Sequence, residues 1–594
     1  MEQMKRTHTC GALRDSDTGA TVVLNGWVHR TRDHGGVHFL NLRDRYGITQ
    51  IVVDEDGSDE LREVASSLRM EFCIAVEGVV RERPDGMKNP EMPTGAIEVS
   101  ASQIRVLSTS EAVPFTIDER SEGRDDVRLK YRYLDLRTFS MQRKIALRHS
   151  VMQGVREFLA GQGFLEIETP TLIRSTPEGA RDFLVPSRLH HGSFYAMPQS
   201  PQLYKQILMV SGFDRYFQIA HCFRDEDARG DRQLEHTQID LEMSFVSRED
   251  VFEVIEGMLG HVFRQSIGVE LETPFQRLSY HDAMNRYGSD KPDLRFDLEM
   301  QDFREFVAGS GFGVFESAVA AEGAVKVLVV PGGGTYSRKQ ISELEEVART
   351  YGAKGLAWTR VVQGQGDLTL DGGIGKFFAG SAAEIAASLG AAPGDMLLFV
   401  ADGWKTATTA LGAVRSRLGR DLGLAAAGSF RFAWVVDFPL FEYEEETGGW
   451  AAAHHMFTMP QERFLATLEE NPGEVLGDLY DLVCNGFELA SGSIRIHDPA
   501  LQQRIFRIVG FDEEEAQRRF GFLLDAFRYG APPHGGIAPG LDRLVMIMAG
   551  EESIREVIAF PKTANGLSPM DGSPGAVDQG QLADLGLALI QNQT

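Results

Sequence analysis

Cysteine is scarce and scattered in this chain of 594 residues. Its four cysteines, Cys10, Cys73, Cys222 and Cys484, form no C-x-x-C pair. We therefore expect neither a disulfide framework nor a cysteine-bound zinc site, and a reducing compartment fits best. Long apolar runs are missing too, because no stretch resembles a signal peptide or approaches the roughly 18 apolar residues of a membrane span. We expect a cytoplasmic protein that does not enter a membrane.

Three common nucleotide and metal motifs are absent. The sequence has no G-x-x-x-x-G-K-[ST] phosphate loop and no H-E-x-x-H metal helix, and the G-Q-G that begins at Gly364 lacks the third glycine of a dinucleotide fingerprint. If the protein handles nucleotides, it uses another architecture.

Positive charge is in short supply, since 60 Lys and Arg face 86 Asp and Glu for a net charge of −26. An acidic chain repels other polyanions at long range, which argues against a nucleic-acid partner. Screening limits that argument to about 8–10 Å. Residues 120–148 carry an excess of basic side chains. We therefore predict that this stretch and an arginine-bearing N-terminal region bind phosphates in a salt-sensitive manner.

The composition, 43% hydrophobic and 25% charged, is that of a globular protein, and the length suggests roughly four domains. Five short alternating apolar runs within residues 1–107 predict a small closed β-barrel of the OB type. Residues 108–130 read as a hinge. Glycine then rises above its share of 62 in 594 residues between positions 297 and 428, which indicates a separate α+β module inserted into a larger domain. That larger domain comprises residues 131–296 and 429–563, and residues 564–594 form a C-terminal extension.

Residues 215–246 give two strand-like runs around a charged loop. In the second run a period of two predicts one polar and one apolar face, the polar face carrying Gln238, Asp240, Glu242 and Ser244 and the apolar face Ile239, Leu241, Met243 and Phe245. Arg224 follows the first run and lies beside the polar floor, where a planar guanidinium suits bidentate contact with phosphate. A solvated surface hairpin is the alternative.

The Asn-Gly pair at 485–486 predicts a two-residue hairpin turn, which would pair Asp481 with Ala490. Asp481 and Glu488 then project from the same face, within reach of one hard cation such as Mg²⁺. A nearby arginine could serve instead. Farther along the strand, Arg495 is a candidate for holding an anion.

A helical apolar stripe follows a Gly- and Pro-rich run near the C-terminus and comprises Leu541, Leu544, Val545 and Met548. Arg543 lies in its first turn. A cation there opposes the helix dipole and is better explained by an anionic ligand at the N-terminus, although a structural arginine is the alternative.

These segments, in this order, resemble the signature motifs of the class II aminoacyl-tRNA synthetases. GFLEIETPTL (163–172) resembles motif 1, FRDE (223–226) motif 2 and GLDR (540–543) motif 3. A closer resemblance to the bacterial aspartyl-tRNA synthetases comes from RSTPEGARDF (174–183), PQSPQLYKQ (198–206), the histidine pair 454–455 and SGSIRIH (491–497). The Gly-rich insertion matches that subfamily as well.

The resemblance implies a multidomain α+β fold: an OB-fold anticodon domain, a hinge, and an antiparallel-sheet catalytic domain interrupted by a GAD-type insertion. It also implies a homodimer built through motif 1. The implied reaction consumes ATP with Mg²⁺. Aspartate attacks the α-phosphorus of ATP to give aspartyl-adenylate and pyrophosphate, and the terminal hydroxyl of tRNA then takes the aspartyl group.

The resemblance assigns roles to individual residues. The implied catalytic residues are Arg224, Glu488 and Arg543. The implied aspartate site comprises Glu178, Gln202, Lys205, Arg224, Asp240, His454 and Arg495. The implied ATP site comprises Arg224, Asp225, Glu226, Gln233, Glu488, Gly540, Leu541, Asp542 and Arg543, and the implied Mg²⁺ ligands are Asp481 and Glu488.

In the barrel, Phe39 resembles the residue on which the family stacks an anticodon base, with Arg32 and Gln50 as further anticodon contacts. Spacing alone favours Phe39 as barrel core. His34 and Gly86 resemble a pair found in bacterial enzymes that do not discriminate between tRNA(Asp) and tRNA(Asn). The implied second product, aspartyl-tRNA(Asn), would be converted by an amidotransferase.

Three alternatives remain open at this point. One is a strictly discriminating aspartyl enzyme. Another is an asparaginyl or lysyl enzyme, in which Arg495 would face an uncharged or cationic substrate side chain that cannot neutralise it. The third is a non-catalytic OB-fold nucleic-acid-binding protein, which predicts losses at Arg224, Glu488 or Arg543, although all three are present. Met456 and His221 depart from the family pattern.

Overall fold

The computed structural model describes residues 5–120, 123–176, 180–364 and 367–590. The chain forms two compact units, one of residues 1–147 with 555–576 and the other of residues 148–554 with 577–594. No helix among the described residues is long and apolar enough to cross a membrane.

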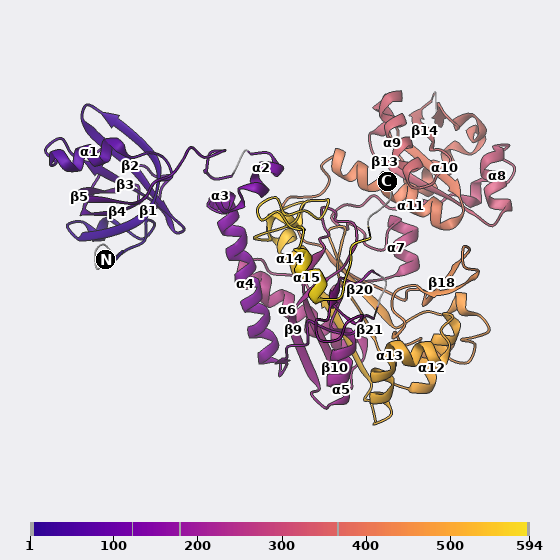
Figure 1. Ribbon diagram of the computed structural model, residues 1–594. Coiled ribbons are helices and arrows are strands. Elements are labelled where there is room, and N and C mark those ends of the chain that lie inside the picture. Colours follow the sequence, from indigo (N-terminus) through magenta and orange to yellow (C-terminus); the bar gives the residue numbers. More distant parts are fainter. Residues whose placement is uncertain (1–4, 121–122, 177–179, 365–366, 591–594) are drawn as a thin grey trace. The chain divides into compact units, whose positions relative to one another are not determined.

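The N-terminal part of the first unit is a closed five-stranded barrel (Figure 1). Around the barrel the strands follow one another as β1 (Thr21–His34), β2 (Val37–Asp44), β3 (Gly47–Val53), β5 (Ile97–Ser108) and β4 (Cys73–Glu82). Alternate residues such as Leu40 and Leu42 fill its core. A helix that the sequence analysis did not predict, α1 (Asp59–Ser67), packs Leu61 and Ala65 against this core. The OB-type barrel is confirmed.

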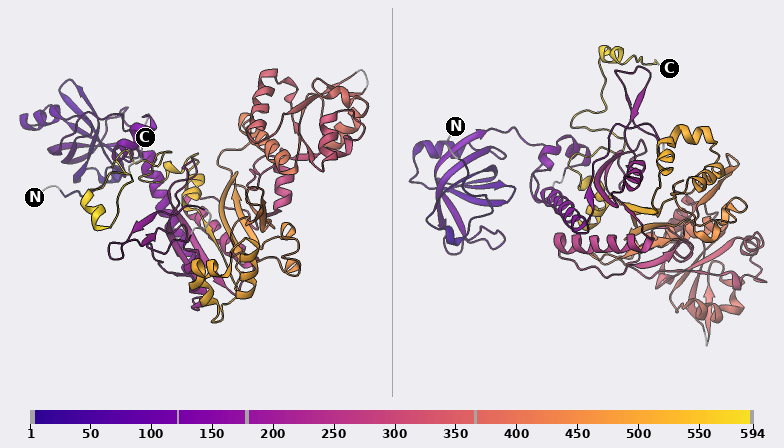
Figure 2. Two further views of the ribbon diagram at one scale, coloured as in Figure 1. Left: turned by 45° about the vertical axis from the view of Figure 1, so that its right-hand side comes forward. Right: turned by 90° about the horizontal axis from the view of Figure 1, so that it is seen from below.

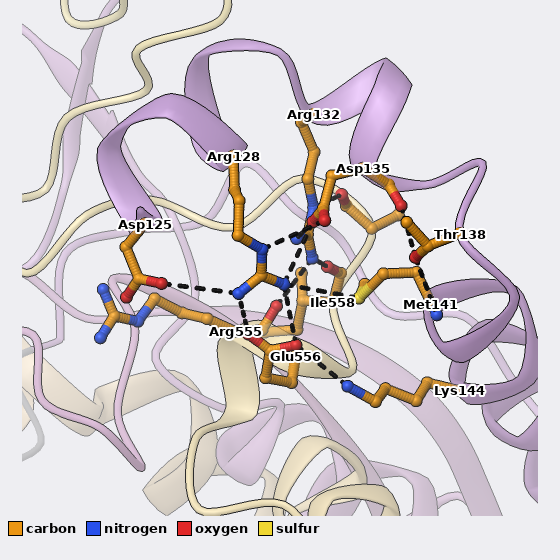
Figure 3. A network of polar contacts seen from close by, with 11 residues as sticks. Asp125, Arg128, Arg132, Asp135, Thr138, Met141, Lys144, Arg555, Glu556 and Ile558 are labelled. Atoms are coloured by element: carbon orange, nitrogen blue, oxygen red, sulfur yellow. Dashed lines mark hydrogen bonds and ion pairs between the residues drawn. The ribbon is translucent and has the colours of Figure 1, made fainter. Parts of the chain in front are cut away.

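The rest of the first unit contains α2 (Asp125–Lys130), α3 (Arg132–Asp135), the beginning of α4 (Phe139–Gly161) and residues 555–576. Figure 3 shows a polar network there. Arg128 contacts both Asp135 and Glu556, at 3.1 and 2.9 Å, and Lys144 donates to Glu556 at 3.0 Å. Arg132 pairs with Asp135 and donates to the carbonyl oxygens of residues 555, 558 and 559.

This network accounts for three of the basic residues in the stretch 120–148. Arg128, Arg132 and Lys144 are buried, and their charges are neutralised inside the unit. Burial alone would raise the pKa of Glu556, but Arg128 and Lys144 together lower it to about 2. These three cations therefore stabilise the unit internally, and the predicted phosphate contact depends on the exposed basic residues of the stretch, such as Lys130.

The second unit is built on an eight-stranded sheet (Figure 2). Its strands run in the order β11 (Gln276–Ser279), β17 (Phe432–Val436), β20 (Leu479–Cys484), β21 (Phe487–Ile494), β22 (His534–Pro539), β10 (Glu235–Ser244), β9 (Arg215–Phe223) and β6 (Leu165–Glu166). Neighbours are antiparallel except at the two edges, where β11–β17 and β6–β9 are parallel.

The second unit also contains further helices and two hairpins. The helices are the C-terminal part of α4, α5 (Gln202–Val210), α6 (Arg248–Ile267), α7 (Tyr280–Tyr287), α12 (Pro499–Ile508), α13 (Glu513–Phe527), α14 (Leu541–Met548) and α15 (Gln579–Asp584). The hairpins are β7 (Leu184–Pro186) with β8 (Phe194–Ala196) and β18 (Phe441–Glu444) with β19 (Gly449–Ala452). Val151, Val155 and Leu159 of α4 recur at helical spacing and are fully buried.

Between β12 and β16 the chain builds a second sheet with a core on each side. Its strand order is β12 (Met300–Asp302), β13 (Ala324–Val330), β16 (Met396–Asp402), β14 (Ala357–Gln363) and β15 (Leu368–Asp371). One face packs against α9 (Arg338–Thr350) and α11 (Trp404–Asp421), and the other against α8 (Gly313–Ala320) and α10 (Ala382–Leu389). Neighbouring residues such as Val327 and Leu328 point into opposite cores, as the period of two requires.

Candidate active site

A cavity of about 490 Å³ lies in the second unit. Its lining combines the loop between β9 and β10 with residues of β10, β21, β22, α5 and the first turn of α14. Twelve residues predicted from the sequence line it, namely Gln202, Lys205, Arg224, Glu226, Gln233, Asp240, His454, Glu488, Arg495, Gly540, Asp542 and Arg543. Segments more than 300 residues apart are thereby brought into one site.

The floor of the cavity is a buried cluster of two cations and two carboxylates. Lys205 Nζ lies 2.8 Å from Asp240 Oδ1 and 3.3 Å from Glu242 Oε2. Arg495 Nε lies 3.0 Å from Glu242 Oε1, and its Nη1 donates to Ser493 Oγ at 2.8 Å. All four charged side chains are at most 5% exposed. The period of two in β10 places both carboxylates on one face, as predicted.

One oxygen of this cluster has no partner. Asp240 Oδ2 is buried and accepts no hydrogen bond within the described residues. Burial raises the pKa of Asp240, although Lys205 opposes the effect. For Glu242, burial alone would raise the pKa, but Arg495 and Lys205 lower it below its ordinary value. The two cations and two carboxylates balance in formal charge. The cluster can therefore accept a ligand that carries both a cationic and an anionic group.

Glu242 is the functional residue that the sequence reasoning placed on the floor but left out of the site. The signal for it was the same period of two that identified Asp240. Its importance depends on Arg495, which directly follows β21, so only the folded chain reveals the pairing. One detail of the same strand is wrong: Phe245 was predicted on the apolar face, but β10 ends at Ser244, and Phe245 has a φ of 59° and is exposed.

The other half of the cavity is rich in arginine. Arg224, Arg229, Arg232 and Arg543 line it together with Lys291. Arg224 forms no ion pair among the described residues, and its Nε atom is buried without a hydrogen-bond partner. Such an orphaned donor suits an anionic ligand. Arg543 contacts Asp231 at 3.1 Å and donates to the carbonyl oxygen of Glu488 at 2.7 Å.

His236 is a second residue that the sequence analysis missed. Its side chain lines the arginine-rich half, and burial together with Arg224 and Arg543 lowers its pKa to about 3. The ring is therefore neutral at physiological pH, and a flat neutral ring among cations suits stacking against a nucleobase. Nothing in the sequence distinguishes it from the other polar residues at the start of β10.

The carboxylate pair on the β20–β21 hairpin has a different register from the predicted one. A bulge between Leu482 and Val483 moves the partner of Asp481 from Ala490 to Ser491, because the bulge inserts one extra residue into β21. Asp481 Oδ1 is nevertheless buried without a partner. Burial and the nearby Glu488 raise the pKa of Asp481 well above its usual range. Two carboxylates with an orphaned oxygen are a donor set that fits a hard cation.

Among the described residues, three of those predicted for the substrate and metal sites are not part of the cavity lining, namely Asp225, Asp481 and Leu541. Leu541 is fully buried in the core. Asp542 lines the cavity, but one of its oxygens pairs with Arg148 and the other accepts the amide of Thr237 at 2.9 Å. The first turn of α14 therefore serves as scaffold at these positions. Glu178 lies outside the described residues.

The predicted nucleic-acid residues lie on the barrel. Phe39 is half-buried and on the face opposite the core residues Leu40 and Leu42, so spacing misassigned it to the core. It pairs with the exposed Arg32 across β1 and β2. Gln50 donates to Glu98 at 2.9 Å.

The predicted discrimination pair is solvent-accessible. His34 is exposed at the end of β1. Gly86 has a φ of 85°, and a Cβ atom there would meet nothing within 4 Å. Both positions are therefore available to an external partner.

Comparison with known proteins gives two family matches. Residues 124–564 match the model of tRNA synthetases class II (D, K and N), and residues 22–107 match the OB-fold nucleic acid binding domain. The chain is 64% identical to the Aspartate–tRNA(Asp/Asn) ligase of Treponema denticola, over 99% of this chain and 100% of that protein. It is 53% identical to the Aspartate–tRNA ligase of Bacillus licheniformis, over 98% of both chains.

Solved structures share the fold. The asparaginyl-tRNA synthetase of Pyrococcus horikoshii complexed with asparaginyl-adenylate matches with a TM-score of 0.59 and 19% identity, covering 94% of this chain and 98% of that one. The aspartyl-tRNA synthetase of Entamoeba histolytica matches with a TM-score of 0.56 and 20% identity, covering 94% and 91%.

Proposed function

Because the chain belongs to the class II tRNA synthetases of the D, K and N group, we propose that it is an aspartate–tRNA ligase that charges both tRNA(Asp) and tRNA(Asn). The observation that carries this proposal is the buried cluster of Lys205, Asp240, Glu242 and Arg495. Aspartate brings one ammonium and two carboxylates. The α-carboxylate reacts, so the cluster needs to hold one cationic and one anionic group.

The geometry gives each group a partner. The side-chain carboxylate of aspartate would lie against Arg495 and Lys205, and its ammonium against Asp240 Oδ2, Gln202 and Glu178. His454 also lines the cavity, and burial lowers its pKa. Uncharged asparagine would leave Arg495 and Lys205 under-neutralised in a desolvated site, which disfavours it by about 2–5 kcal/mol.

ATP would occupy the arginine-rich half of the cavity. Arg224 would contact the α-phosphate and the reacting carboxylate, Arg543 the γ-phosphate, and Glu226 and Gln233 the nucleotide. The α-carboxylate oxygen of aspartate attacks the α-phosphorus, and pyrophosphate leaves with the electron pair of the broken bond. No protein nucleophile is required, since catalysis consists of positioning and charge stabilisation.

Mg²⁺ fits the carboxylates of Asp481 and Glu488, given the orphaned oxygen of the former. When bound, the cation would offset the negative charge of the phosphates. Titrating Mg²⁺ with a non-hydrolysable ATP analogue by calorimetry tests this site. Asp481→Asn should abolish the Mg²⁺-dependent part of the binding, and unchanged binding would contradict the assignment.

The barrel would bind the anticodon through Phe39, Arg32 and Gln50, with His34 and Gly86 permitting tRNA(Asn). Aspartyl-tRNA(Asn) made in this way would pass to an amidotransferase. The relatives from Treponema denticola and Treponema pallidum carry the name Aspartate–tRNA(Asp/Asn) ligase, which supports the broader specificity.

A homodimer and a cytoplasmic location complete the proposal. Large apolar side chains are exposed on β6, shortly after it and on the β7–β8 hairpin, namely Leu165, Leu172, Leu184, Leu189 and Phe194. Such a concentration is typical of a subunit interface. We also propose the domain bounds 1–107, 108–130, 131–296, 297–428, 429–563 and 564–594. Sedimentation of the purified protein should give twice the chain mass of 65.7 kDa.

Two assays test the function. ATP–pyrophosphate exchange should depend on aspartate and not on asparagine or lysine, and exchange with another amino acid would overturn the substrate assignment. Purified tRNA(Asn) should then accept aspartate. If only tRNA(Asp) is charged, the enzyme is strictly discriminating and the wider proposal fails.

A further inference from the structure

Three buried polar side chains form a hydrogen-bonded network that runs from the sheet to the floor of the cavity. His534 at the start of β22 and Gln206 on α5 are fully buried, and Gln202, one turn earlier on α5, is 5% exposed. Gln206 Nε2 lies 3.1 Å from His534 Nε2, and Gln202 Nε2 lies 3.1 Å from Gln206 Oε1. Of the three, only Gln202 lines the cavity.

His534, at the buried end of this network, fixes the direction of every hydrogen bond in it. His534 Nδ1 lies 2.8 Å from the carbonyl oxygen of Pro532. A carbonyl oxygen only accepts, so Nδ1 carries the proton and Nε2 of the neutral ring is an acceptor. Gln206 must therefore turn its NH₂ group to His534 and its oxygen to Gln202. Gln202 must in turn donate its NH₂ group to Gln206.

The group of this network that faces the cavity is the side-chain carbonyl oxygen of Gln202, and its direction is fixed. Gln202 Oε1 makes no hydrogen bond to any residue that the structure describes. An amide can otherwise present either its oxygen or its NH₂ group, and only the oxygen attracts an ammonium group. The buried network removes this ambiguity, because it fixes which end of the Gln202 amide faces the cavity.

We propose that Gln206 and His534 are positioning residues that hold the Gln202 amide with its oxygen toward the ammonium of the bound amino acid. The inference rests on the proposed function, in which Gln202 contacts that ammonium. Neither Gln206 nor His534 touches the substrate, so both act through Gln202.

The groups around His534 keep its ring neutral and so keep the network in this hydrogen-bonded arrangement. Glu242 favours a protonated His534, as does the Pro532 carbonyl, while Arg495 and His497 oppose it. Burial is the largest effect and lowers the pKa of His534 below its ordinary value. A proton on Nε2 would force both glutamine amides to reverse, which would present an NH₂ group to the ammonium.

The test uses Gln206→Met, which keeps the approximate volume and removes the hydrogen bonds. In ATP–pyrophosphate exchange the KM for aspartate should rise about tenfold, the scale of one hydrogen bond to a charged group. The KM for ATP should stay within about twofold. His534→Phe, at the other end of the network, should also raise the KM for aspartate. Gln502→Met replaces an equally buried glutamine outside the cavity and should leave both values unchanged.

Succinate separates orientation from general damage, because it is aspartate without the amino group. If Gln206 acts through the ammonium, Gln206→Met leaves the inhibition constant of succinate unchanged. An equal loss for succinate and aspartate would mean a merely structural role and would overturn the proposal. In a Gln202→Met background, Gln206→Met should add no further rise in KM, and additive effects would likewise overturn it.

Failure of the proposed function has a different signature. In that case the unmodified protein shows no aspartate-dependent exchange at all. If the unmodified protein is active and Gln206→Met, folded by circular dichroism, has an unchanged KM for aspartate, only the positioning role is refuted.

Discussion

Arg148 in α4 forms an ion pair with Asp542 in α14, 394 residues farther along the chain. The second oxygen of Asp542 accepts the amide of Thr237 in β10. Asp542 thereby fixes the first turn of α14 against both α4 and β10. The next residue is Arg543, which points into the cavity. This ion pair therefore sets the position of Arg543, the arginine that we propose contacts the γ-phosphate.

Arg148→Met should weaken ATP use more than aspartate use. It leaves the buried Asp542 without its cation, and breaking such a pair costs about 2–5 kcal/mol. We expect kcat/KM for ATP to fall by about thirtyfold or more, which corresponds to about 2 kcal/mol. Exchange kinetics at varied ATP and aspartate measure the effect. Arg143→Met, which removes an exposed pair with Glu119, is the control and should change little.

Arg495→Ala should collapse aspartate activation. It removes the cation for the substrate carboxylate and leaves Glu242 buried without its main partner. Breaking a buried pair costs about 3–5 kcal/mol, so stability should fall as well. Arg495→Met combined with Glu242→Leu separates the two effects, because it should restore thermal stability but not aspartate-dependent exchange. Near-normal exchange by Arg495→Ala would disprove the assignment.

Much of the site could be predicted from sequence because its residues lie in short segments with a strong local pattern. The period of two in β10 gave Asp240 and Glu242 one face, and the apolar stripe of α14 put Arg543 in the first turn. Both depend only on regular geometry, and both agree with the structure.

What could not be predicted depends on partners far away in the chain. Asp542 looks like a ligand in its motif, but Arg148 occupies it. Arg128 and Lys144 look like open cations, but Glu556 neutralises them. The bulge that moves Asp481 opposite Ser491 has no local signature. Charge in a sequence does not reveal which opposite charge it meets after folding.

The Glu556 network should give the first unit a stabilising contribution that is lost in acid. A pKa lowered from 4.5 to about 2 is worth about 3 kcal/mol. Because the folded pKa is depressed, this contribution is complete above about pH 4.5 and disappears as the pH falls toward 2. Glu556→Gln should lose it at every pH.

Hydrogen exchange of residues 125–135, corrected for the intrinsic pH dependence, measures this effect. At pH 7 Glu556→Gln should exchange faster than the unmodified protein, and the difference should shrink as the pH drops below about 4.5. Glu119→Gln, from the exposed pair with Arg143, should match the unmodified protein. A difference that stayed undiminished from pH 7 to pH 2.5 would show that the charge of Glu556 is not the cause.

Phe39→Ala should separate tRNA recognition from amino-acid activation. Phe39 is on the outer face of the barrel, and stacking on a base is worth about 1–3 kcal/mol. We therefore expect kcat/KM for tRNA charging to fall by about 5- to 150-fold, while ATP–pyrophosphate exchange stays unchanged because the reacting groups lie in the other unit. Leu107→Ala, also exposed on the barrel, is the control. If Phe39→Ala instead lowered the thermal stability and left charging intact, the residue would serve the barrel and not the anticodon.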